Sequence, residues 1–140
     1  MSQRLIIWAI VWLVAGCERL VDSRIDIAVS EDSGGHVFQF ESCAWSFRPQ
    51  RVDVPLIVLL KETEAGRVSH CELRKSSPSV RSLASSWRYG TVPHGYVAQG
   101  CEPLQPNETY QIQVSAAGGG RREFSVAPDG HLILGKGSCR

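Results

Sequence analysis

The amino-acid sequence predicts an all-β fold, an antiparallel β-sandwich held by two disulfide bonds. Short stretches in which apolar and polar residues alternate recur along the chain, and clusters of Gly, Pro, Asn, Asp and Ser separate them. No stretch repeats apolar residues at the spacing of a long amphipathic helix. Four of the five cysteines follow the N-terminal region, and an even number suits two disulfides in a small exported domain.

The N-terminal segment has the features of an export signal. A positive charge precedes the unbroken apolar run Leu5–Val14, and the small pair Ala15-Gly16 follows it. The run is shorter than the roughly 20 residues that a membrane-spanning helix needs, so a permanent transmembrane anchor is not expected. Leu13–Cys17 (LVAGC) resembles the lipobox of bacterial lipoproteins. The resemblance implies cleavage after Gly16 and lipid attachment at Cys17.

We therefore expect a signal peptide at 1–16, a lipidated tether at 17–23 and one β-sandwich domain at 24–140. The full chain has 15 basic and 14 acidic side chains, and Arg4 is removed with the signal peptide. The mature chain is therefore formally neutral, so nucleic acid is not an expected partner. The lipid is expected to hold the protein on a membrane. Glu18 follows the cysteine, whereas aspartate there resembles an inner-membrane retention signal of Gram-negative lipoproteins. The outer membrane, with the domain facing the periplasm, is therefore favoured.

The elements of the predicted sandwich follow from local pattern. Ile25, Ile27 and Val29 share one face of a first strand, and 31–35 is a turn. Residues 56–60 are apolar at successive positions, which favours a central strand buried on both faces. The predicted strands and hairpins are, in order, 25–29, 37–40, 43–47, the hairpin 54–74, 87–89, 96–99, the hairpin 109–127 and 132–134.

One segment gives the sandwich a more specific class. Leu104–Val114 (LQPNETYQIQV) resembles the L-x-P-x-x-x-Y-x-V-x-V segment of fibronectin type III and related immunoglobulin-like domains. The resemblance implies that Leu104 fills the core below a turn and that Tyr110 forms a tyrosine corner at the penultimate strand. The tyrosine hydroxyl would then reach the backbone near Leu104 to Pro106. The predicted fold is therefore an immunoglobulin-like β-sandwich.

The four downstream cysteines allow three disulfide pairings. We favour Cys43–Cys71 with Cys101–Cys139, because each pair would lie at the open end of one predicted hairpin. Their wide spacing, with no histidine close enough to complete a chelating pair, argues against a zinc site.

The sequence contains no recognisable catalytic arrangement. The four histidines are scattered among turns and strand ends, and no serine lies in a nucleophile-elbow pattern. Paired cysteines leave no free thiol to act as a nucleophile. We therefore expect neither an enzyme nor a cofactor or metal site.

Two classes of function remain. The favoured one is a protein-binding or assembly module that a lipid anchors in the cell envelope and that offers loops and sheet edges to an envelope protein. The alternative is an envelope lipoprotein that inhibits a hydrolase, either a lysozyme or a protease. The candidate binding loop comprises Gly118, Gly119, Gly120, Arg121 and Arg122, because a flexible hairpin tip with two exposed arginines suits recognition.

Overall fold

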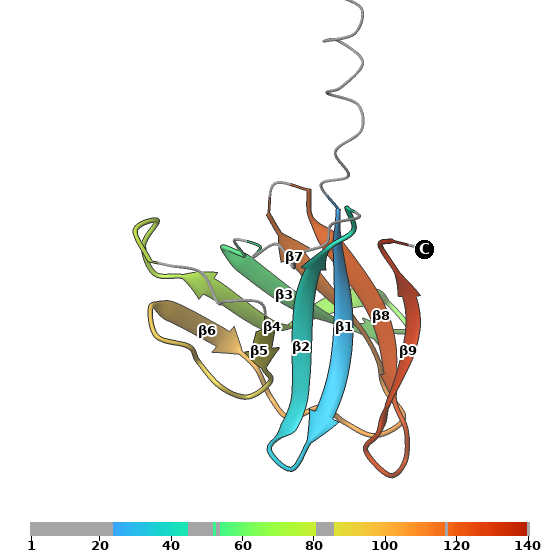
Figure 1. Cartoon of the computed structure of the whole chain (residues 1–140). Helices are drawn as coiled ribbons and strands as arrows, with labels where there is room; N and C mark the ends of the chain where they lie inside the picture. Colours follow the sequence, from blue (N-terminus) through green and yellow to red (C-terminus); the bar gives the residue numbers. More distant parts are fainter. Residues whose placement is uncertain (1–23, 45–51, 53, 81–85, 117, 140) are drawn as a thin grey trace, which may run out of the picture.

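Two antiparallel β-sheets pack face to face (Figure 1). The computed structural model describes residues 24–44, 52, 54–80, 86–116 and 118–139. The strands of this part of the chain are β1 (Ile25–Asp32), β2 (Gly35–Ser42), β3 (Leu56–Thr63), β4 (Gly66–Lys75), β5 (Ser86–Arg88), β6 (Tyr96–Gly100), β7 (Thr109–Ser115), β8 (Gly120–Val126) and β9 (Leu132–Gly137).

The strand order is that of an immunoglobulin-like sandwich. One sheet has the order β1-β2-β5, and the other has the order β6-β4-β3-β7-β8-β9. The first, second and fifth strands thus face a sheet built on the third, seventh and eighth strands, as the A, B and E strands face C, F and G in immunoglobulin domains. The predicted fold class and the hairpins 54–74 and 109–127 are confirmed. Over the described residues, no helix has the length and apolar character needed to cross a membrane.

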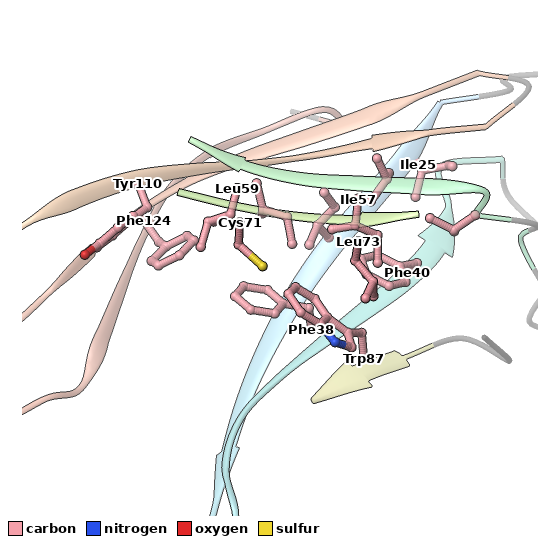
Figure 2. Close-up of a cluster of buried hydrophobic side chains, with 14 of the residues drawn as sticks. Ile25, Phe38, Phe40, Ile57, Leu59, Cys71, Leu73, Trp87, Tyr110 and Phe124 are labelled. Carbon is pink, nitrogen blue, oxygen red and sulfur yellow. The ribbon is translucent and has the colours of Figure 1, made fainter. Parts of the chain in front are cut away.

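Aromatic side chains join the two sheets in the core. The Phe38 ring lies 5.8 Å from the Trp87 ring and 5.6 Å from the Phe124 ring, measured between centroids. Phe124 stacks in turn on Tyr110 at 5.6 Å. Figure 2 shows these side chains between the sheets, with Leu59 and other aliphatic residues beside them. This row of rings crosses from β5 and β2 to β8 and β7, so the aromatic packing fixes how the sheets face each other.

Strand β3 is central in its sheet but is not covered equally on its two faces. Ile57 and Leu59 are buried in the core, whereas Leu56, Val58 and Leu60 point to the outer face and remain half-buried. The apolar run therefore predicted the position of the strand between β4 and β7 correctly. The prediction that β3 is buried on both faces overestimated the burial of its outer face, which is half-buried.

The tyrosine corner is present. Tyr110 is fully buried, and its hydroxyl oxygen accepts a hydrogen bond of 3.0 Å from the backbone N–H of Gln105. Leu104 packs against the core, while Pro106 is exposed in the turn that follows. The segment before β7 therefore has the local structure that its resemblance implies.

The predicted disulfide pairing is wrong. The disulfides are Cys43–Cys139 and Cys71–Cys101, not Cys43–Cys71 and Cys101–Cys139. The prediction assigned β6 no partner strand. In the structure β6 pairs with β4, which places Cys101, the residue after β6, next to Cys71. Cys43 follows β2 in the other sheet, where the chain end after β9 also arrives. Each disulfide therefore links neighbours in the sandwich, and neither closes a hairpin.

Tyr110 provides a test of the fold. Tyr110→Phe should lower the free energy of unfolding by about 0.5 to 1.5 kcal/mol, because the Gln105 N–H loses its acceptor. Tyr110→Ala should lower it by about 3 to 5 kcal/mol, because it also leaves a cavity between Phe124 and the sheet. Urea unfolding measures both changes. Equal and small shifts of the two midpoints would contradict a structural tyrosine corner.

Candidate functional site

The predicted binding loop lies where the described chain begins. Gly119 adopts a positive φ of 63° in the β7–β8 turn, and its carbonyl oxygen accepts a hydrogen bond of 2.8 Å from the N–H of Ile25. A Cβ atom on Gly120 would meet the Ile25 carbonyl oxygen at 2.4 Å. Glycine at this position lets β8 approach the first strand closely. The start of β1, the β7–β8 turn and the C-terminal end therefore share one end of the sandwich (Figure 1), which we call the N-terminal end.

The two arginines of the loop differ in environment. The sequence analysis expected both to be exposed, but the Arg122 side chain is only 12% exposed. Its guanidinium donates to the Ile27 carbonyl at 2.8 Å and to the Asp26 carboxylate at 2.9 Å. Arg121 is exposed, and its side chain forms no ion pair within the described residues. Arg122 thus joins β8 to β1, and Arg121 alone is available to a ligand.

A shallow hollow of about 580 Å³ lies beside this loop. The described residues of its lining include two cationic side chains, those of Arg24 and Arg121. The Arg24 guanidinium donates to the Ser138 carbonyl at 3.0 Å, and the Ser138 hydroxyl accepts a hydrogen bond of 2.7 Å from the Arg121 N–H. Glycines 118 to 120 form the rest of one wall. The described lining is therefore polar and made largely of small residues, with two arginines among them.

A second surface is the edge of β6, where none of the described strands continues the sheet. Hydrogen bonds from Cys101 N to His70 O and from Ser76 N to Gly95 O fix the pairing of β6 with β4. Because antiparallel strands alternate their bonding direction, Ala98 and Gly100 point their N–H and C=O groups away from β4. Val97, on the outer face of this strand, is 55% exposed. The edge therefore offers backbone donors and acceptors beside an apolar side chain.

Within the part of the chain that the structure describes, the β6 edge lacks the usual protection against strand pairing. Edge strands are commonly blocked by proline, by charged side chains or by a covering element, but the sequence of β6, YVAQG, contains neither proline nor charge. Strand β9, at the opposite edge, differs because the Glu31 carboxylate of β1 accepts a hydrogen bond of 2.8 Å from the Leu132 N–H. Within the described residues, the β9 edge thus carries a contact from β1 at Leu132, whereas no described strand pairs with the outer side of β6.

The open edge is held rigidly at both ends. The Cys71–Cys101 disulfide joins β4 to the residue that follows β6, with 4.1 Å between the two Cα atoms. At the other end the Tyr96 hydroxyl donates to the Val54 carbonyl at 2.8 Å in a buried position. A partner strand would therefore meet an edge that is already ordered, which lowers the entropic cost of pairing.

A pocket of about 490 Å³ begins where β6 ends. Its lining includes the disulfide-bonded Cys101, the apolar residues Pro103 and Leu104, and the Tyr89 ring. The Tyr89 hydroxyl donates to the Glu102 carbonyl, and burial raises the pKa of Tyr89. The wall is mostly apolar, so the pocket suits an apolar side chain. The pocket thus adjoins the residue that follows β6, and the sequence analysis missed both this pocket and the β6 edge.

Titratable groups gather at the end opposite the predicted loop. Glu31 accepts a hydrogen bond of 2.6 Å from Nδ1 of His131, which raises the pKa of His131 and lowers that of Glu31. Asp32 pairs with Arg88 on the same side, and the pKa of Asp32 falls to about 2 because of that hydrogen-bonded pair. The described residues include no group of three or more histidine, cysteine, aspartate or glutamate side chains placed to hold a metal ion. These contacts tie β1 to β9 and to the end of β5.

Cys17, the predicted lipidation site, lies outside the described residues. Comparison with protein families, with curated proteins and with solved structures found no match to this chain. The function is therefore argued from the two surfaces and from the sequence motifs.

The two loop arginines should respond differently to substitution. Arg122→Ala should destabilise the domain by about 1.5 to 3 kcal/mol, because the Asp26 carboxylate and the Ile27 carbonyl lose charge-assisted hydrogen bonds. Arg121→Ala is the matched control and should change the unfolding free energy by less than about 0.5 kcal/mol. Urea unfolding of both variants gives the comparison. Equal losses would contradict the structural role of Arg122.

Proposed function

We propose that this protein is a lipid-anchored envelope protein whose domain binds an extended segment of a partner protein along the β6 edge. The lipobox-like Leu13–Cys17 supports lipid attachment at Cys17 and an outer-membrane location facing the periplasm. The open edge of β6 is the observation that carries the binding role. The proposal places the protein among binding and assembly modules and assigns it no catalysis.

The chemistry of the β6 edge suits β-strand addition. In this mode of recognition, main-chain hydrogen bonds supply affinity and side-chain pockets supply specificity. Ala98 and Gly100 offer the main-chain groups, and Val97 offers an exposed apolar contact. The pocket beside Tyr89 and Leu104 lies at the end of the same strand. A partner strand of about five residues with an apolar side chain at one end fits this arrangement.

The Gly118–Arg122 loop is less suited to capturing a partner from the periplasm. It lies at the end from which the chain leads back to Cys17, so a lipid on that cysteine would keep the loop near the membrane. The β6 edge lies on the side of the sandwich, away from the β1–β8 contact (Figure 1). The edge therefore remains open to a partner while the lipid is in the bilayer.

Lipid attachment is tested at Cys17. Cys17→Ser should abolish metabolic labelling with a radioactive fatty acid and release the protein from membrane fractions, because the acyl chains provide the anchor. Wild-type protein from the same cells is the control. A Cys17→Ser protein that stays in the membrane fraction, together with an unlabelled wild type, would contradict the anchor.

Partner binding is tested at the β6 edge with a photo-reactive residue at Val97, in cells of the source bacterium. The same residue at Val68, an exposed valine of the same sheet, is the matched control. Position 97 should cross-link one discrete envelope protein, and position 68 should not. Ala98→Pro should abolish that cross-link without unfolding the domain, because the Ala98 N–H points away from β4 and proline is tolerated there. Ala98→Val keeps the N–H and should retain the cross-link.

Equal cross-linking at positions 97 and 68, or a cross-link that survives Ala98→Pro, would contradict binding at the edge. The captured protein also separates the two functional classes. A lysozyme or protease that loses activity on binding would favour the alternative role of hydrolase inhibitor, whereas a structural or assembly protein would support the proposed module.

A further inference from the structure

We infer that the Glu31 carboxylate and the His131 ring form a pH-dependent clasp, which holds the start of β9 to β1 in mildly acidic solution and loosens as the solution becomes alkaline. The clasp lies at the end of the sandwich opposite the Gly118–Arg122 loop. The inference rests on contacts within the domain, so it is independent of the proposed lipid at Cys17 and of the proposed partner at β6.

A single carboxylate makes the contact between the two strands at this end. Oε2 of Glu31 lies 2.6 Å from Nδ1 of His131, and Oε1 accepts a hydrogen bond of 2.8 Å from the backbone N–H of Leu132. Glu31 belongs to β1 of the three-stranded sheet, whereas Leu132 begins β9 at the edge of the six-stranded sheet. The clasp therefore joins the two sheets and caps a backbone N–H of an edge strand.

Two contacts that do not titrate near neutral pH hold the other end of β9. The Arg24 guanidinium donates to the Ser138 carbonyl at 3.0 Å, and the Cys43–Cys139 disulfide joins the residue after Ser138 to the residue after β2. A guanidinium stays protonated at any pH at which the domain is studied, and a disulfide has no proton to lose. A change of pH is therefore expected to loosen β9 from its first residue, while its C-terminal end stays fixed.

Other charged or titratable groups of the described chain surround the clasp. His36 of β2 places Nδ1 3.3 Å from the clasp carboxylate, without the alignment of a hydrogen bond. Oδ2 of Asp129, in the β8–β9 turn, lies 3.9 Å from Nε2 of His131. Asp32 of β1 pairs with Arg88 of β5. The His131 ring thus has a carboxylate beside each of its nitrogens, and this arrangement favours its charged form.

The two titrations give the clasp a defined pH range. The hydrogen bond to Glu31, and then the charge of Asp129, raise the pKa of His131 above its ordinary value of 6.5. This attraction is complete below 6.5 and is lost as the pH rises through the raised pKa. The hydrogen bonds from His131 and Leu132 lower the pKa of Glu31 below its ordinary value of 4.5, so its attraction is lost only as the pH falls through that lowered pKa.

The clasp is therefore tightest between pH 4.5 and pH 6.5. A neutral His131 can still donate from Nδ1, so the contact weakens above that range and does not disappear. Because Leu132 shares the same carboxylate, the capping of its N–H should follow the charge of the ring.

The experiment uses the chain from residue 17 to 140 with Cys17→Ser, which keeps every described residue. NMR follows the ring signals of His131 and the hydrogen-exchange protection factor of the Leu132 amide, which removes the intrinsic pH dependence of exchange. From about pH 5 to 9, we expect the protection factor to fall about two- to fivefold, the effect of one exposed charge pair. The midpoint should equal the pKa of His131 and lie above 6.5.

Three conservative variants separate the groups. His131→Gln keeps a hydrogen-bond donor but removes the titration, so the protection of Leu132 should no longer change with pH. Glu31→Gln keeps an acceptor for the Leu132 N–H and removes the charge, so the pKa of His131 should return toward about 6.5. His94→Gln is the matched control, because it removes an exposed histidine from the loop between β5 and β6 and should change neither reading.

A pH-dependent protection of Leu132 that survives His131→Gln would overturn the inference. If that dependence then disappears in His36→Gln, the titrating group is the neighbouring histidine of β2. A protection factor that stays constant across the pKa of His131 would also overturn the clasp, and so would a His131 pKa at or below its ordinary value. The amide spectrum of the remaining strands verifies that each variant is folded.

Discussion

The packing of Phe38 between the two sheets is the contact on which the rest of the structure depends. Phe38 touches Trp87 within its own sheet and Phe124 across the core, and Phe124 stacks on Tyr110. Four large aromatic side chains, each contributing about 1.5 to 3 kcal/mol by burial, therefore set the facing of a three-stranded sheet on a six-stranded one. Because the smaller sheet covers only part of the larger one, some strands of the larger sheet must lie beyond that cover.

The consequences differ at the two sides of the larger sheet. On the β9 side, two side chains join β1 to the larger sheet. Arg122 of β8 donates to the Ile27 carbonyl and the Asp26 carboxylate, and Glu31 of β1 accepts a hydrogen bond from the Leu132 N–H. On the β6 side, none of the described strands continues the sheet. A disulfide and a buried tyrosine hydrogen bond nevertheless keep that edge ordered. An ordered edge with no described strand beside it is what the proposed binding role requires.

Local patterns in the sequence predicted the local structure. The alternation in 25–29, the two hairpins and the segment leading to Tyr110 depend on neighbouring residues, and all of them are confirmed. The errors concern contacts between distant residues. No local signal shows that β6 returns to β4, and this pairing decides the partner of Cys71. Likewise, the carbonyl that Arg122 binds lies 95 residues earlier in the chain, so the arginine pair looked uniformly exposed in the sequence.

The candidate sites were only partly predictable for the same reason. The sequence drew attention to the glycine-arginine loop, but the contact of Gly119 with Ile25 is what places that loop beside the start of the domain. With β1 placed there, the proposed lipid at Cys17 and the proposed partner on β6 would not compete for one surface. The hollow beside Arg24 and Arg121 lies at the N-terminal end, whereas β6 lies at the side of the sandwich away from β1 and β8 (Figure 1). In the proposed anchored state, a domain held by its N-terminal end would therefore present the β6 edge sideways and not toward the bilayer.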